Sequence, residues 1–168
     1  SICTPPAYHA EQVEELAAAG VHVLVEKPMA PSIQDCRRMI AAAREAGARL
    51  MVGQKKRFSP LYALLKEKLE SDFGQPLWAS VKYALGRVDK PWFWGEEDGG
   101  GPILENTIHV FDLLRFLMGE IVVVYAQGGH LFYPGFSDQI DTAAVVLRFH
   151  SGGCATVACG YGSEWGFA

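Results

Sequence analysis

Two short stretches of this 168-residue chain combine residue types that can move protons. Lys27 stands between Glu26 and Pro28 at the end of the apolar run VHVLVEKP. Glu105 precedes His109 by four residues in GGGPILENTIHVFD, a spacing that places both side chains on one face of a helix. A lysine in a partly closed cleft can polarise a hydroxyl or carbonyl, and an imidazole can accept or donate a proton. The two stretches therefore predict acid-base chemistry.

Other interpretations remain open for both stretches. Glu26 and Lys27 could simply mark the point where a buried strand meets water, and Glu26 points to the opposite face from Lys27 if the strand continues. His109 could be a hydrogen-bonded core histidine, and a Glu-His pair at helical spacing could form half of a metal site. Further metal ligands are not obvious in the sequence, so we expect no metal.

The first third of the chain alternates strand and helix. We expect strands over 1–4, 21–28 and 49–53, and helices over 6–20 and 32–47. Each helix ends at a glycine, Gly20 or Gly47, and Ser32 with Asp35 is a plausible N-cap. Short apolar strands joined by amphipathic helices are typical of a parallel α/β sheet. Lys27 then lies at the carboxyl ends of the strands, where ligands usually bind.

The pattern changes after residue 53. The stretch GQKKRFSP connects to a predicted helix over 59–74, with Pro60 at its first position, and a strand over 76–88 follows. In the stretch 99–119, a glycine turn leads into a helix that carries Glu105 and His109. Strands over 121–132, 141–150 and 153–163 follow without intervening helices, which predicts an antiparallel sheet. We predict one domain over 1–54 and an α+β domain over 55–168, with a cleft between them.

Composition excludes several classes of function. The net charge is -4 and no basic stripe is present, so nucleic acid is not an expected partner. No apolar segment approaches the ~20 residues of a membrane helix, so we expect no membrane partner. The four cysteines form no CxxC pair, which favours free thiols in a cytoplasmic protein; they are Cys3, Cys36, Cys154 and Cys159.

Taken in order, SICTPPAYHAEQVEELAAAGVHVLVEKPMA, MVGQKKRFSP and GGGPILENTIHVFDLLRFLMG closely resemble the Gfo/Idh/MocA family of NAD(P)-dependent oxidoreductases, over essentially the whole chain. The resemblance implies a partial Rossmann-like, dinucleotide-binding domain over 1–54. It implies a substrate and oligomerisation domain over 55–168, with a mostly antiparallel open sheet. The implied reaction transfers a hydride between NAD or NADP and a hydroxyl-bearing carbon of a sugar, cyclitol or related polyol. The implied assembly is a homo-oligomer formed through the open sheet.

The resemblance also implies roles for individual residues. The catalytic set is Lys27, Glu105 and His109. The cofactor-binding set is Thr4, Pro5, His9, Glu26, Lys27, Pro28, Gln54 and Arg57. The substrate-binding set is Lys27, Glu105, His109, Trp92 and Trp94. The tryptophans could form a lid over a polyol or pack in a core, while Tyr161 and Trp165 are expected on the open sheet as dimer contacts.

Two departures from the family pattern affect these expectations. Many members carry aspartate four residues before the histidine, where this chain has Glu105, which could mark a different substrate subgroup. The family's G-x-G-x-x-G turn, which binds the pyrophosphate, is absent from this sequence. Our hypothesis is that the chain is a fragment of a longer dehydrogenase that is inactive alone and binds NAD(P) weakly or not at all. Tight stoichiometric binding of NADH by the isolated chain would refute the weak binding. The alternative is a non-catalytic small-molecule-binding or oligomerisation module, against which Lys27 and His109 argue.

Overall fold

The computed structural model describes residues 1–88, 90–95, 99–133 and 139–162. It contains a two-stranded parallel sheet near the N-terminus and a four-stranded mixed sheet farther along the chain. The predicted α/β class is therefore confirmed. In the described part of the chain, no helix is long and apolar enough to cross a membrane.

The N-terminal sheet pairs β1 (Val23–Val25) with β2 (Leu50–Val52). The expected strand over 1–4 is reduced to a single parallel bridge between Ile2 and Val25. A short 3-10 turn (Pro6–Tyr8) leads into α1 (His9–Ala18), which packs on α2 (Ile33–Glu45). Residues from both helices and from β1 form the core of this part, and they include Val13, Val25 and Met39.

The predicted helix ends are confirmed. The Ser32 side chain accepts a hydrogen bond from the Asp35 backbone N–H at 3.0 Å and caps α2. Gly20 and Gly47 follow the ends of the two helices with φ of 73° and 63°, a left-handed conformation that glycine adopts without steric cost. These boundaries follow from local chemistry alone.

The rest of the chain builds the second sheet and the helices around it. A 3-10 turn (Lys55–Phe58) precedes α3 (Pro60–Lys68), which continues as a π-helical turn (Leu69–Phe73). The strands are β3 (Trp78–Ala84), β4 (Ile121–Gly129), β5 (Thr142–Phe149) and β6 (Cys154–Gly160). Between β3 and β4 lie a 3-10 turn (Pro91–Trp94), a π-helical turn (Ile103–Thr107) and α4 (Ile108–Met118).

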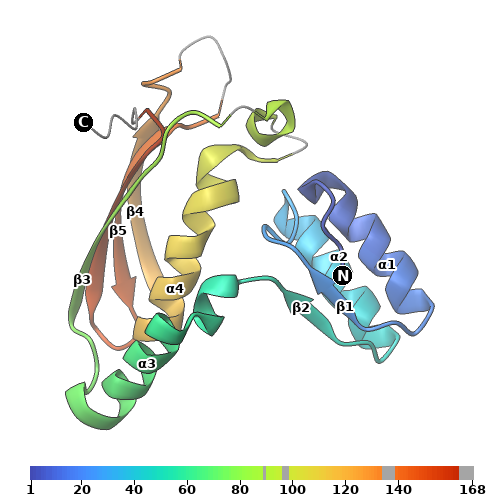
Figure 1. Cartoon of the computed structure of the whole chain (residues 1–168), viewed down its shortest axis with the longest axis horizontal. Coiled ribbons are helices and arrows are strands. Elements are labelled where there is room, and N and C mark those ends of the chain that lie inside the picture. The colour runs from blue at the N-terminus through green and yellow to red at the C-terminus, as the bar shows by residue number, and fades with distance from the viewer. Residues whose placement is uncertain (89, 96–98, 134–138, 163–168) are drawn as a thin grey trace.

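The strand order is β3-β6-β5-β4, with antiparallel pairing except for the parallel pair β3 and β6. Helix α4 lies along one side of this sheet, between the sheet and the N-terminal part (Figure 1). The core between α4 and the sheet is apolar, and its buried residues are Val110, Leu114, Met118, Val145, Leu147, Phe149, Ala155 and Val157. The other face of the sheet carries exposed side chains, including Tyr125 and Val146, which pair across β4 and β5.

The expectation that Tyr161 is a surface dimer contact is wrong. Tyr161 is fully buried and packs with Phe93 and Trp94. It follows β6 with the same parity as the buried Val157 and Cys159, and alternate residues of a strand share a face. The other expected contact, Trp165, lies outside the described residues.

Candidate functional site

An ion pair joins the two predicted chemical stretches. The Lys27 ammonium donates to the Glu105 backbone carbonyl at 2.6 Å and to Glu105 Oε2 at 2.9 Å. The side chains are 17% and 4% exposed, so the pair is largely removed from water. Lys27 follows the carboxyl end of β1 and Glu105 lies in the π-helical turn before α4. The fold thus brings together residues that are 78 positions apart.

Glu105 has one satisfied and one unsatisfied carboxylate oxygen. Burial raises the pKa of Glu105 above its ordinary value, while the hydrogen bond and charge of Lys27 act in the opposite direction. Glu105 Oε1 is buried and finds no hydrogen-bond partner among the described residues. Buried polar atoms are normally satisfied by protein, water or a ligand. Glu105 thus keeps one carboxylate oxygen without a hydrogen-bond partner among the described residues.

His109 lies in the first turn of α4 and is 7% exposed. Burial lowers the pKa of His109 to about 4, and the positive charges of Lys27, Lys56 and Lys55 act in the same direction. The ring is therefore neutral at pH 7 and able to accept a proton. Its Nδ1 is buried without a hydrogen-bond partner in the part of the chain that the structure describes.

A cavity of about 280 Å³ opens beside the Lys27–Glu105 pair. Its lining residues are Cys3, Thr4, Pro5, Pro6, Glu26, Lys27, Trp92 and Glu105. Four of the predicted cofactor contacts are among them, since Thr4, Pro5, Glu26 and Lys27 all line the cavity. Cys3 and Pro6 were not predicted, although they flank Thr4 and Pro5 in the same motif.

Glu26 differs from its expected orientation. The sequence places it on the opposite face from Lys27 if the strand continues, but β1 ends at Val25. Beyond that residue strand alternation no longer applies. Glu26 Oε2 accepts a hydrogen bond from the Lys27 backbone N–H at 3.1 Å, and both residues line the cavity.

The two tryptophans predicted as substrate contacts are separated by the fold. Trp92 lines the cavity. Trp94 is 6% exposed, donates from Nε1 to the Val88 carbonyl at 2.8 Å and packs edge-on against Tyr133. Residues two apart on a 3-10 turn, which has three residues per turn, point in different directions. Trp94 belongs to the core and does not line the cavity.

Arg57 and Gln54 lie beside another cavity. The Arg57 guanidinium forms two hydrogen bonds with the Asp112 carboxylate, Nε to Oδ2 at 2.8 Å and Nη2 to Oδ1, and this pairing raises the pKa of Arg57. Arg57, Gln54 and Asp112 line a cavity of about 430 Å³ that shares no lining residue with the first. Arg57 therefore ties the connection between the two parts to α4. A cofactor contact by either residue stays a prediction.

Two other predicted cofactor contacts are buried beneath the site. Pro28 is fully buried and does not line the cavity. His9 is 0% exposed, and its ring nitrogens lie within hydrogen-bond distance of backbone carbonyls of Thr4, Pro28 and Met29. Its ring therefore has no surface with which to touch a cofactor. The described residues contain no group of three or more His, Cys, Asp or Glu side chains that could hold a metal ion.

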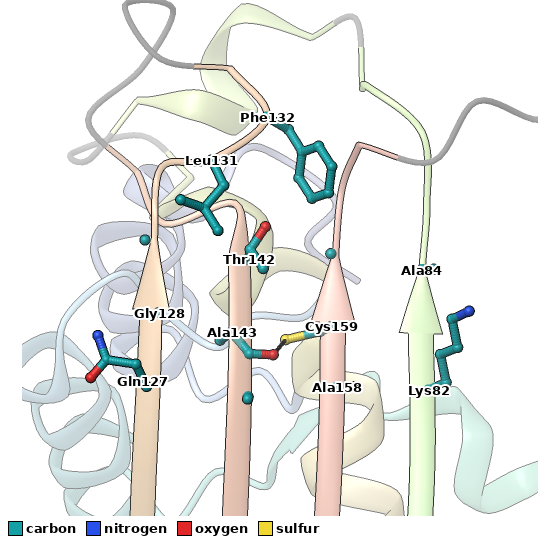
Figure 2. Close-up of a pocket in the computed structure, with 13 residues that line it drawn as sticks. Lys82, Ala84, Gln127, Gly128, Leu131, Phe132, Thr142, Ala143, Ala158 and Cys159 are labelled. Atoms are coloured by element: carbon teal, nitrogen blue, oxygen red, sulfur yellow. Dashed lines mark hydrogen bonds between the residues drawn. The ribbon is translucent and has the colours of Figure 1, made fainter.

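Cavities larger than the candidate site lie elsewhere in the described part of the chain. A cavity of about 540 Å³ lies on the open face of the second sheet, where Gln127 and Lys82 stand on the two outer strands and Phe132 lies near the strand ends (Figure 2). Cys159 donates to the Ala143 carbonyl there at 3.4 Å. This lining includes no acid and no histidine. The smaller cavity is the candidate site because Lys27 and Glu105 line it, although His109, four residues beyond Glu105, does not.

Comparisons with known proteins show the family of the chain. The family profile described as oxidoreductase family, NAD-binding Rossmann fold, matches residues 1–54, and the one described as GFO/IDH/MocA C-terminal domain matches residues 62–166. The chain is 34% identical to myo-inositol 2-dehydrogenase of Thermotoga maritima over 160 residues, which are 93% of this chain and 47% of that protein. It is 32% identical to 1,5-anhydro-D-fructose reductase of Ensifer adhaerens, covering 90% of this chain and 46% of that protein.

A solved structure is also similar. The WlbA dehydrogenase from Bordetella pertussis, in complex with NADH and UDP-GlcNAcA, matches with a TM-score of 0.90 and 30% identity. The match covers 98% of this chain and 49% of that one. The chain thus spans about half the length of the relatives it matches. Because the family profiles match nearly all of its residues, the chain belongs to the Gfo/Idh/MocA oxidoreductase family.

Proposed function

We propose that this protein is an NAD(P)-dependent dehydrogenase. It transfers a hydride between the nicotinamide ring and a hydroxyl-bearing carbon of a sugar, cyclitol or related polyol. The observation that carries the proposal is the buried Lys27–Glu105 pair beside a cavity, with a neutral His109 four residues from the glutamate. Relatives named for inositol and anhydrofructose support the substrate class.

The proposed chemistry assigns one task to each residue. Oxidation of an alcohol removes a hydride from carbon and a proton from oxygen, and the nicotinamide cofactor supplies the hydride acceptor when bound. The neutral imidazole of His109 accepts the hydroxyl proton. The Lys27 ammonium has three N–H donors and gives two to Glu105, so the third can hold the substrate oxygen as it becomes a carbonyl. Glu105 Oε1 accepts a hydrogen bond from a second hydroxyl.

The cavity lining fits the reactive end of the cofactor. Thr4, Pro5 and Pro6 form a mostly uncharged segment that suits the nicotinamide ring and its ribose. The unpartnered oxygen Oε1 of Glu105, a residue that lines the cavity, suits a hydroxyl of a polyol. Both NAD and NADP remain proposals, because the G-x-G-x-x-G turn and the ribose-reading residue that follows it do not occur in this sequence.

We further propose that the protein forms a homo-oligomer through the open face of the second sheet. Strand register aligns four exposed side chains across this face, one from each strand: Ser80, Thr156, Val146 and Tyr125. Tyr125 is 73% exposed and Val146 49%. Exposed apolar side chains in contiguous positions are typical of protein interfaces.

Turnover of sugars and cyclitols by the full gene product, with NAD and with NADP, tests the proposed activity. We expect Lys27→Ala and His109→Ala each to lower kcat/KM by about 10²- to 10⁴-fold, the range for loss of a general acid-base group. Lys68→Ala is the control, because Lys68 forms an exposed salt bridge with Asp72 away from the cavity. Full activity in both site variants would contradict the roles given to Lys27 and His109. A wild type without activity would favour a non-catalytic binding module.

A further inference from the structure

The His9 side chain connects two loops that carry the candidate site. His9 is the first residue of α1 and is 0% exposed. Its Nε2 lies 2.9 Å from the Thr4 carbonyl oxygen. Its Nδ1 lies 3.1 Å from the Pro28 carbonyl oxygen and 3.2 Å from that of Met29. The ring therefore stands between the loop that follows Ile2 and the loop that follows β1.

These two loops supply most of the cavity lining. The first contributes Thr4, Pro5 and Pro6, and the second contributes Glu26 and Lys27. Backbone hydrogen bonds join the segments up to Glu26, whose N–H donates to the Ile2 carbonyl at 3.0 Å. Past Glu26, the hydrogen bonds that the structure describes between the loops pass through His9. Beyond Glu26, the described hydrogen bonds that link the Lys27 loop to the Thr4 loop thus involve one imidazole.

The two connections require a donor at each ring nitrogen. A backbone carbonyl only accepts hydrogen bonds, so each ring nitrogen must donate to hold its loop. A neutral ring donates from one nitrogen and an imidazolium from both. Helix α1 anchors the ring, since Ala10 and Val13 pack in the core of the N-terminal part. The hydrogen bonds of His9 therefore fix both loops relative to helix α1.

We propose that His9 is a positioning residue that sets the spacing between the Thr4 loop and the Lys27 loop. The inference rests on the proposed dehydrogenase function, because it assigns the Lys27 loop to the substrate and the Thr4 loop to the cofactor. His9 touches neither ligand. Its effect on the reaction passes through the backbone of both loops, and displacements of about 1 Å at a reacting group can reduce rates by about 10²-fold.

Three substitutions of His9 remove its hydrogen bonds to the Thr4 loop and to the Lys27 loop, either one at a time or together. In His9→Asn, the amide nitrogen replaces Nδ1 and keeps a donor toward Pro28 and Met29. In His9→Gln, the amide nitrogen replaces Nε2 and keeps a donor toward Thr4. His9→Phe keeps a ring but removes both donors. We expect His9→Asn to keep kcat and to raise the KM for the cofactor. We expect His9→Gln to keep the cofactor KM and to lower kcat. His9→Phe should raise the cofactor KM and lower kcat, and each change should be about tenfold or more.

Hydrogen exchange on the unliganded full gene product gives a second readout. We expect His9→Phe to speed exchange in segments 1–8 and 23–31 and to leave α2 unchanged. His9→Asn should speed only the first segment and His9→Gln only the second. Val13→Ala is the matched control: Val13 is also 0% exposed and lies one turn along α1, but it donates to neither loop. It should lower the Tm without the segment-specific pattern.

The two readouts distinguish failure of this inference from failure of the proposed function. Unchanged kinetics and unchanged exchange in His9→Phe would overturn the positioning role. So would a uniform rise in exchange in all His9 variants that matches Val13→Ala. A wild-type protein without dehydrogenase activity would reject the proposed function, and the exchange pattern would still decide whether His9 positions the loops.

Discussion

Burial shifts the pKa values of the two titratable residues Glu105 and His109 in opposite directions. Burial favours the neutral form of both Glu105 and His109, raising the pKa of the first and lowering that of the second. Lys27 offsets the burial of Glu105 by direct pairing, yet the same positive charge disfavours protonated His109. The Lys27 ammonium thus opposes the effect of burial on the pKa of Glu105 and adds to the effect of burial on the pKa of His109.

The lowered pKa of His109 predicts a pH dependence of stability. In the unfolded chain His109 titrates near 6.5, whereas in the folded state its pKa is about 4. Between these values the unfolded state binds a proton that the folded state does not, so the free energy of unfolding falls as the pH is lowered from 6.5 to 4. The loss is at most about 3 kcal/mol.

Denaturant unfolding of the wild type and His109→Asn at several pH values between 4 and 7 measures this loss. We expect the wild type to lose more stability than the variant as the pH falls, because asparagine does not titrate. The raised pKa of Glu105 is common to both proteins and largely cancels in the difference. Parallel pH profiles would show that His109 is not held neutral by its surroundings.

At the scale of elements, the π-helical turn before α4 carries Glu105, and a hydrogen bond to Tyr161 supports this turn. Thr107 is fully buried in this turn, and its hydroxyl lies 3.2 Å from the Tyr161 hydroxyl. Tyr161 follows β6, and its carbonyl accepts a hydrogen bond from the Tyr133 hydroxyl at 2.9 Å. The end of the second sheet therefore supports the element that carries the acid.

Tyr161→Phe tests this support. The substitution keeps the ring in the core and leaves the Thr107 hydroxyl without its tyrosine partner, so we expect the free energy of unfolding to fall by about 1 kcal/mol. Tyr125→Phe, at a 73% exposed position on the open face, should change it by less than about 0.5 kcal/mol. Thermal or denaturant unfolding measures both. Equal stabilities for the wild type and Tyr161→Phe would show that the Tyr161 hydroxyl does not stabilise the turn that carries Glu105.

At the scale of the whole molecule, the proposed oligomer interface predicts the effect of a charge on the open face. Val146 lies in a central strand of that face and is 49% exposed. Val146→Glu would bury a carboxylate in the interface, so we expect dissociation to a smaller species, measured as the mass by light scattering. Ile33→Glu, at a 73% exposed position at the start of α2, is the control. Equal masses for the wild type and both variants would reject this interface.

Patterns within a few residues were enough to predict the helix ends, the parallel sheet near the N-terminus, and the two stretches that carry Lys27 and His109. Capping by Ser32, the left-handed glycines and strand alternation depend on interactions between neighbours in the chain. Strand parity also indicates the burial of Tyr161 when the alternation of β6 is followed past its end. The resemblance to a family, which also depends on motifs in order, agreed with the later comparisons.

Contacts between segments that are far apart in the sequence are seen only in the tertiary structure. The sequence did not indicate that Lys27 pairs with Glu105, that Arg57 pairs with Asp112, or that Trp92 lines the cavity while Trp94 enters the core. Each outcome depends on the relative position of elements far apart in sequence, because a side chain's direction is local but its partner is not. His9 is the clearest example: its helix was predictable, and its role between two loops follows from tertiary distances alone.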